Sequence, residues 1–292
     1  MDYAFKQYDK MISHRFLIRL QSIYGVLKSA ERRAADTMLE NPQFIASSSI
    51  VDVAKVSQCS DATLVRLARK LGYSSYPELK SSILLTDINQ EEIFYEELLP
   101  TDDCKTILDK VFNAARQALT DTQTLVNAKD FEKALSYIID AGVITFIGSG
   151  DASTVAYSAF LKFSRCGFNA RYSRDYDVQL VEASKLTKND VLVIITHSGN
   201  TQTLFDVAKC AKLKNAKIIT ITTYPLSHIA KISDIILLTA AFSPNICNEI
   251  MAKRIPELSI IEALYINAIL RSDKKHQETL QQSNDVLLLN KI

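Results

Sequence analysis

The sequence contains few of the residues that mark fibrous, disordered or disulfide-stapled proteins. Its 292 residues include seven glycines, six prolines and five cysteines. These numbers are too small for a collagen-like, low-complexity or disulfide-scaffold protein, whereas 47% apolar and 23% charged residues are ordinary for a globular chain. At roughly 100–200 residues per domain, the length corresponds to about two domains.

Long apolar runs are also missing. The longest stretches, such as VLVII at 191–195, are far shorter than the ~20 residues that a membrane-spanning helix needs. The first ten residues have charges of both signs, and no apolar segment typical of a secretory signal follows them. We therefore expect a cytoplasmic protein that does not associate with membranes.

The cysteines and histidines are too scattered for a metal site. Neighbouring cysteines lie 37 to 62 residues apart without a CxxC pair, and their odd number fits reduced thiols. The histidines form no HExxH or HxxxH pair. We predict that the chain binds no metal. The histidines are His14, His197, His228 and His276.

The charge of the chain is nearly balanced. Its formal net charge is +1, with 12 Lys and Arg against 9 Asp and Glu in residues 1–90, and 22 against 24 in residues 91–292. This mild excess of positive charge is a weak footprint for nucleic acid. Charge alone does not decide whether the first segment binds DNA.

The region 15–86 has the pattern of short helices. Ser29 is positioned to cap a helix that runs to about Glu40, and Ser49 and Ser60 are positioned to cap two more. The third helix has apolar residues on one face and ends at Gly72. The pattern predicts a compact helical domain at residues 1–90.

An acidic segment separates this region from an alternating helix and strand pattern. Residues 91–103 combine six acids with a proline, which is typical of a linker. Beyond it, the domain at 104–292 combines short β-rich runs with stretches of helical length. These helical stretches lie at about 103–127, 130–140 and 247–270, and a polar tail follows at 273–292. This alternation predicts an α/β sandwich with a five-stranded parallel sheet. The expected strands are 143–147, 168–172, 191–195, 218–222 and 235–238.

Residues 49–73 have the spacing of a helix-turn-helix. Ala54 is the small residue where two helices cross, residues 57–60 form the turn, and Leu64 packs the second helix back. Gln58 stands where most such motifs have glycine and where the backbone commonly needs a positive φ. Either Gln58 is strained or the turn differs.

The second helix of this motif presents residues that suit DNA. Arg66 could read guanine, Val65 could contact a thymine methyl group, and Arg69 and Lys70 suit phosphates. The alternative is that these are solvated charges on a helical, protein-binding module. The candidate DNA-binding residues are Ser60, Asp61, Thr63, Val65, Arg66, Arg69 and Lys70.

Two loops that follow predicted strands suit a phosphate group. GSGDAS at 148–153 and THSGNT at 196–201 each lead from a strand into a helix, where free amides, the helix dipole and hydroxyl groups favour an anion. Single serines there are more often helix caps, and His197 could be only structural. The candidate ligand-binding residues are Ser149, Gly150, Ser153, Thr196, His197, Ser198, Gly199, Asn200, Thr201 and Asp177.

A nucleotide cofactor is disfavoured. GSGDAS resembles a truncated dinucleotide-binding loop, but that interpretation requires an acidic residue near the end of the next strand. The chain has Arg171, Tyr172 and Ser173 there. We predict no cofactor.

Residues 27–80 resemble the N-terminal domain of the RpiR family of bacterial transcriptional regulators, and 143–270 resemble its sugar isomerase (SIS) domain. The resemblance implies a DNA-binding regulator whose SIS domain senses a phosphosugar and which controls genes for sugar uptake and breakdown. It also implies a homodimer or homotetramer formed through the SIS domain. By position, Thr196, Ser198 and Thr201 would hold the phosphate.

The resemblance is imperfect in the first loop. The usual serine falls on Ala152, so either Ser149 or Ser153 replaces it. The resemblance places 173–179, with Asp177 and Gln179, over the sugar hydroxyls, and it places Glu249 and Glu257 where SIS enzymes often have a carboxylate for proton transfer. We assign no catalytic residue, because a regulator needs only differential binding to two states.

Two alternatives to a regulator remain at this point. The chain could be a phosphosugar isomerase or etherase whose helical segment only mediates assembly. It could also be an interaction module without affinity for DNA, which predicts no salt-dependent binding to any duplex.

Overall fold

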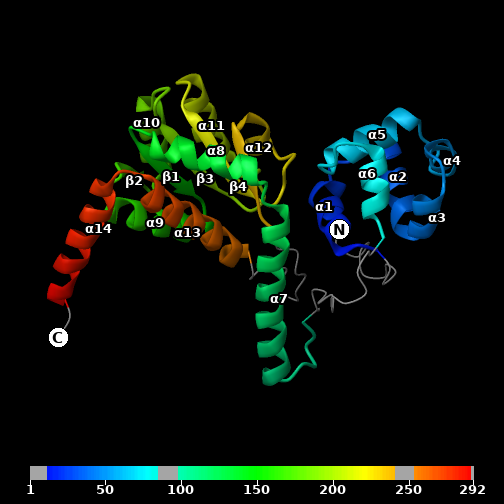
Figure 1. Ribbon diagram of the computed structural model, residues 1–292, viewed down its shortest axis with the longest axis horizontal. Helices are drawn as coiled ribbons and strands as arrows, with labels where there is room; N and C mark the ends of the chain where they lie inside the picture. The colour runs from blue at the N-terminus through cyan, green and yellow to red at the C-terminus, as the bar shows by residue number, and fades with distance from the viewer. Residues whose placement is uncertain (1–11, 85–97, 241–252, 291–292) are drawn as a thin grey trace. The chain divides into compact units, whose positions relative to one another are not determined.

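The computed structural model describes residues 12–84, 98–240 and 253–290 and divides the chain into two compact units (Figure 1). The division falls between Phe94 and Tyr95. Residues 91–97 of the expected linker and the whole of 241–252 lie outside the described residues. Each unit has its own apolar core and is described by itself.

The described part of the first unit is helical throughout. Leu64, Leu67 and Leu79 are fully buried together with Phe16 and Met38, so the apolar faces of the amphipathic helices meet in one core. The isolated bridge between Ile12 and Leu84 joins its two ends. The helices are α1 (His14–Tyr24), α2 (Ser29–Glu40), α3 (Pro42–Ser47), α4 (Ile50–Val56), α5 (Asp61–Lys70) and α6 (Tyr76–Ser82).

Two of the three predicted helix caps are confirmed. The hydroxyl of Ser49 accepts from the amide of Asp52, and that of Ser60 accepts from the amide of Thr63. The prediction for Ser29 is wrong, because Ser29 is the first residue of α2 and Lys28 is its N-cap. The Glu31 carboxylate accepts from the Lys28 amide at 3.0 Å, so an acidic side chain within the first turn satisfies this donor.

The second unit contains the predicted five-stranded parallel sheet. The strand order is β2-β1-β3-β4-β5, and every pair is parallel. All residues of β1 and β3 are buried, as expected for central strands covered on both faces. The strands are β1 (Ile144–Gly148), β2 (Ala170–Tyr172), β3 (Val191–Ile195), β4 (Lys217–Thr222) and β5 (Ile235–Leu238).

Helices cover both faces of the sheet and complete a three-layer sandwich (Figure 1). One face packs against α8 (Ala128–Ile139), α9 (Ala152–Arg165) and α13 (Arg254–Arg271), and the other against α10 (Tyr176–Lys185), α11 (Gln202–Leu213) and α12 (His228–Ile232). The fold class predicted from the sequence is thereby confirmed. The long helix α7 (Cys104–Leu125) precedes this sandwich.

The polar tail forms a helix rather than a loose end. Helix α14 (Lys274–Leu287) and a short 3₁₀ turn (Leu288–Asn290) follow α13. The ring of His276 stacks on Phe168 with centroids 4.0 Å apart, and its Nδ1 is 2.8 Å from the Cys166 carbonyl oxygen. These contacts hold α14 near the end of α9. Across the described ranges, no helix has the length and apolarity needed to span a membrane.

Candidate functional site

Helices α4 and α5 have the geometry predicted for a helix-turn-helix. Ala54 is buried where the helices approach, and Leu64 is fully buried on the inner face of α5. Gln58 in the turn has a φ of 49°, so the chain adopts the positive φ that glycine usually supplies. A guanidinium nitrogen of Arg33 donates to the Gln58 carbonyl at 2.7 Å, which holds the turn in this conformation.

The predicted DNA-binding residues of this motif fall into three groups. Ser60 and Thr63 are engaged at the start of α5, where their hydroxyl oxygens lie 3.0 Å apart and Thr63 is buried. Asp61 and Arg69 are exposed, and Val65 is half-buried. The remaining two, Arg66 and Lys70, are paired with a residue of another helix.

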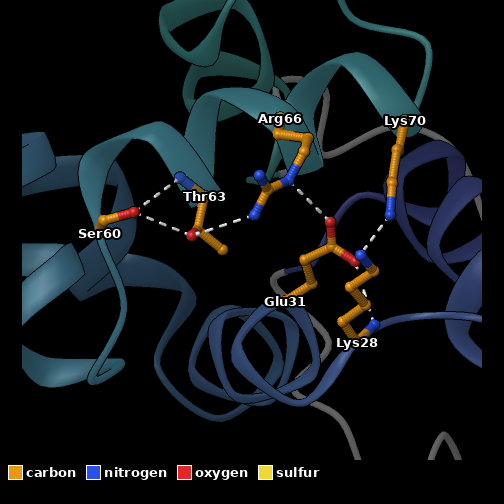
Figure 2. Close-up of polar contacts among 6 residues, drawn as sticks. All are labelled: Lys28, Glu31, Ser60, Thr63, Arg66 and Lys70. Atoms are coloured by element: carbon orange, nitrogen blue, oxygen red, sulfur yellow. Dashed lines mark hydrogen bonds and ion pairs between the residues drawn. The ribbon is translucent and has the colours of Figure 1, made fainter.

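That residue is Glu31 of α2, which lies beneath α5 (Figure 2). Its Oε1 accepts from Nε of Arg66 at 3.1 Å, and its Oε2 accepts from Nζ of Lys70 at 2.7 Å. The Glu31 side chain is 1% exposed, while those of Arg66 and Lys70 are 56% and 26% exposed. Burial by itself raises the pKa of Glu31, but the hydrogen bonds from Lys70, the Lys28 amide and Arg66 leave that pKa below its usual value.

In the second unit, the two predicted loops meet at the point where the strand order reverses. The chain passes from β1 to the edge strand β2 and returns to β3 on the other side of β1. Gly148 pairs with Ile195 at the ends of β1 and β3, so residues 149–153 and 196–201 leave the sheet side by side. Parallel α/β sheets bind ligands at this switch point, in the crevice beyond the carboxyl ends of the strands.

The first loop folds tightly onto the start of α9. A Cβ atom on Gly148 would lie 2.5 Å from the Ala152 carbonyl oxygen, so only glycine allows this approach. The Ser153 hydroxyl donates to the Gly150 carbonyl at 2.6 Å. Ser149 is exposed. Of the two residues that could replace the usual serine at Ala152, Ser149 is exposed, whereas the Ser153 hydroxyl stabilises the loop.

The second loop uses its side chains mostly to shape its own backbone. The buried Thr196 hydroxyl accepts from the Gly199 amide at 3.2 Å. The exposed Ser198 hydroxyl accepts from the Asn200 amide at 3.3 Å, and the Asn200 side-chain oxygen accepts from the amide of His228. Gly199 has a φ of 64°. The loop leaves Ser198 and the half-buried Thr201, the N-cap residue of α11, as its outermost hydroxyls.

His197 is held in a neutral form within this loop. Its Nδ1 lies 3.0 Å from the Thr223 hydroxyl, and its ring meets Tyr224 edge-on. Its Nε2 is buried and has no hydrogen-bond partner among the described residues. Burial, with a smaller effect of the Lys253 charge, lowers the pKa of His197 to about 4.

The start of α13 adds charged groups beside both loops. The Lys253 ammonium lies 3.5 Å from an Asp151 carboxylate oxygen in the first loop. One turn further along, Glu257 is 1% exposed, and within the described part of the chain neither of its carboxylate oxygens has a hydrogen-bond partner. Burial raises the pKa of Glu257 to about 8, although Lys253 and Arg254 oppose the rise.

The segment expected over the sugar hydroxyls lies in α10. Asp177 is exposed in the first turn of that helix, and no described hydrogen bond or ion pair joins it to either loop. Gln179 is buried and donates to the Ser173 carbonyl at 2.8 Å. It lines a separate cavity of about 610 Å³ beside β2, together with Thr145 and Arg171. Glu249 lies outside the described residues.

Comparison with known proteins agrees with this two-part architecture. A family model described as "Helix-turn-helix domain, rpiR family" matches residues 14–90, and the SIS domain model matches residues 137–267. An uncharacterised HTH-type transcriptional regulator of Thermotoga maritima is 34% identical over 268 residues, which are 91% of this chain and 95% of the relative. The chain belongs to the RpiR family of transcriptional regulators.

Two further relatives illustrate how much of this RpiR-family regulator is shared. The HTH-type transcriptional regulator RpiR of Escherichia coli K12 is 25% identical over 257 residues, 88% of this chain and 87% of the relative. The Vibrio vulnificus NanR protein, solved in complex with ManNAc-6P, superposes with a TM-score of 0.60 at 24% identity and covers 94% of this chain and 98% of its own. The same fold therefore extends over both units.

The sequence reasoning missed two charged residues of this regulator. Neither Glu31 nor Lys253 is among the candidate residues of the sequence analysis. An acid in the first turn of a helix and a Lys-Arg pair shortly before a helical proline are weak signals in a sequence. Only the tertiary contacts with α5 and with the first loop distinguish them from solvated charges.

Proposed function

We propose that this RpiR-family regulator binds operator DNA through α5 and responds to a phosphorylated sugar in its SIS domain, thereby controlling genes for uptake and breakdown of that sugar. The domains are then 1–90 for DNA, 91–103 as linker and 104–292 for the effector. The main support is the switch-point site, where two hydroxyl-bearing loops meet beside a lysine. NanR, a protein of the same fold, was solved with a phosphosugar, ManNAc-6P.

The phosphate group belongs at the 196–201 loop in this proposal. Ser198 and Thr201 supply hydroxyl donors, and the free amides of the first turn of α11 add the positive end of the helix dipole. The Thr196 hydroxyl accepts from the Gly199 amide, which shapes the loop, and it keeps its own hydrogen to donate to the phosphate.

The sugar end then lies toward α13 and the first loop. A Glu257 side chain whose pKa is about 8 is mostly protonated at neutral pH, so it donates a hydrogen bond to a sugar oxygen without burying a charge. Neutral His197 offers a donor or an acceptor at Nε2. Lys253 supplies a positive charge between the two loops. This arrangement suits binding, which is all that an effector site needs.

A phosphosugar isomerase remains the second candidate, and Glu257 is the observation that favours it. A buried, unpartnered carboxyl group with a pKa raised to about 8 is a suitable proton-transfer group for chemistry at carbons 1 and 2 of a sugar. An enzyme would interconvert phosphorylated sugars and lose that turnover in Glu257→Gln. A regulator would show no turnover with or without that substitution.

The SIS domain is also the part that assembles, as a dimer or tetramer, in this proposal. Large apolar side chains are exposed along α7 and α13, including Leu108, Phe112 and Leu270, which are 51%, 60% and 69% exposed. A second copy would bury them. Two copies of α5 would then read two operator half-sites.

A thermal-shift screen tests the effector site. Phosphorylated hexoses, N-acetylhexosamines and pentoses are added to the wild type, to Ser198→Ala, to Thr201→Ala and to the control Ser184→Ala, whose hydroxyl bonds only within α10. A ligand at 100 times its Kd stabilises the folded state by about 2.7 kcal/mol. We expect one sugar phosphate to raise the Tm of the wild type and the control but not of the two loop variants. An equal shift in all four proteins, or no shift for any sugar, would contradict the proposal.

A further inference from the structure

The buried carboxylate of Glu31 receives three donors, two of them from the recognition helix. Arg66 and Lys70 donate from successive turns of α5, and the Lys28 amide donates from the start of α2. Both α5 donors are cations, so one buried negative charge faces two positive charges (Figure 2). Hydrogen bonds to a charged group are roughly twice as strong as neutral ones, so they favour one conformation of both long side chains.

These contacts limit what Arg66 can do. Its Nε atom is bound to Glu31, and one terminal nitrogen lies 3.4 Å from the Thr63 hydroxyl, which in turn lies against Ser60. The guanidinium therefore lies along the flank of α5 that faces α2 (Figure 2). Bidentate recognition of guanine requires two adjacent donors directed at the base. In this pose one terminal nitrogen remains without a described partner, which suits a single phosphate oxygen.

A different line of residues is directed outward from α5. Ala62, Val65 and Arg69 are three and four residues apart and so share one helical face. Ala62 and Arg69 are exposed and Val65 is half-buried. Within the described residues, the Arg69 side chain has no hydrogen bond or ion pair. Its guanidinium is free to present two donors to a base edge.

We propose that Glu31 is a positioning residue of the DNA interface, which holds Arg66 and Lys70 on the flank of α5 as phosphate contacts and leaves the base edges to Val65 and Arg69. The inference rests on the proposed role of α5 in DNA binding. It changes the expected role of Arg66 from base reading to backbone contact. Glu31 acts through its two cationic partners and does not itself touch DNA.

A positioning role and a purely structural role predict different behaviour of the salt dependence. Without the Glu31 charge, Arg66 and Lys70 become mobile and one net positive charge is gained beside the DNA. Binding to any sequence then releases more counterions, and the slope of log K against log salt steepens by about one. A merely structural residue changes the fraction of folded protein, which lowers all affinities together and leaves that slope unchanged.

The experiment compares Glu31→Gln with Asp36→Asn, which removes the same charge from the same helix. Asp36 accepts a hydrogen bond from Tyr24. The probes are a duplex selected by the wild-type protein from a randomised pool and a scrambled duplex of equal composition. For Glu31→Gln we expect the ratio of selected to scrambled affinity to fall at least tenfold, with the steeper salt slope. For Asp36→Asn we expect both quantities to match the wild type.

A second variant, Arg66→Lys, tests the same inference if Glu31→Gln does not fold. Arg66→Lys retains the charge and leaves Lys70 paired with Glu31, but it cannot bond to Glu31 and Thr63 in one plane. Because phosphate contacts fix the register in which α5 presents Val65 and Arg69 to the bases, we expect its affinity ratio to fall while its salt slope stays at the wild-type value. The inference would be overturned if Glu31→Gln lost affinity for the selected and the scrambled duplex to the same extent. It would also be overturned if Arg66→Lys kept the wild-type ratio of selected to scrambled affinity. Failure of the wild type to bind any duplex would instead overturn the proposed function itself.

Discussion

The Nζ atom of Lys253 lies 3.5 Å from Oδ2 of Asp151, which joins the beginning of α13 to the loop after β1. The contact brings the amino-terminal turn of α13 to the switch point of the sheet, where the 196–201 loop also begins. Lys253 lowers the pKa of both His197 and Glu257. Lys253 therefore links the start of α13 to the loop after β1 and to the 196–201 loop, although these three segments are distant in the chain.

The pH dependence of stability reports on Glu257. Its pKa in the folded state is about 8, well above the roughly 4.3 of an unfolded glutamate, so the folded state holds a proton that the unfolded state has released. Wild-type stability therefore decreases, relative to Glu257→Gln, as pH rises from about 5 to 8, and the difference levels off above that range. Calorimetric Tm values of the two proteins at pH 5, 6.5 and 8 measure it. Parallel Tm curves would show that Glu257 titrates normally.

The contribution of Glu31 to stability is expected to have the opposite dependence on pH. Its pKa is lowered in the folded state, so its contribution to stability is complete above the unfolded pKa and is lost as pH falls through the lower, folded value. Wild type should lose more stability than Glu31→Gln between about pH 5 and pH 3. At pH 7 we expect Glu31→Gln to be less stable by about 1–3 kcal/mol, because hydrogen bonds to a charged group are lost. Urea unfolding of both proteins, followed by circular dichroism at pH 7, 5 and 3, tests the direction of this pH dependence.

Gly199 is expected to tolerate no side chain. Its φ is 64°, and an added Cβ atom would lie 2.0 Å from the Ser227 hydroxyl oxygen. Gly199→Ala should therefore destabilise the protein by at least about 2 kcal/mol and abolish any sugar-phosphate thermal shift. The matched control is Gly25→Ala, because Gly25 has a helical φ of −64° and no atom within 4 Å of the added Cβ. Equal Tm values for the two variants would contradict the loop geometry.

Gln58 allows a test of the turn between α4 and α5. Its φ of 49° is unfavourable for β-branched side chains. Gln58→Val should lower the free energy of unfolding by about 1–2 kcal/mol, whereas Gln58→Gly should match or exceed the wild type. The Arg33 bond is made to the backbone carbonyl, so both variants retain it. A stable valine variant would mean that the turn adopts another conformation in solution.

Local patterns in the sequence were sufficient for much of the fold. Ser49 and Ser60 cap helices because a hydroxyl meets an amide three residues away, which needs no tertiary contact. The β-rich runs became the five strands within a few residues of the expected limits. The candidate loops followed from the same pattern, since residues after parallel strands leave the sheet at one edge.

The side chains that meet from distant parts of the chain were decided by tertiary structure alone. Glu31 and Arg66 are 35 residues apart, and Lys253 reaches Asp151 only because α9 and α13 pack on the same face of the sheet. The sequence by itself determined most of the helices, strands and caps, because those preferences act over a few residues; the cap of α2 and helix α14 are exceptions. The packed core then determined which charges lose their water and acquire a partner, and therefore whether Arg66 is directed outward or held along α5.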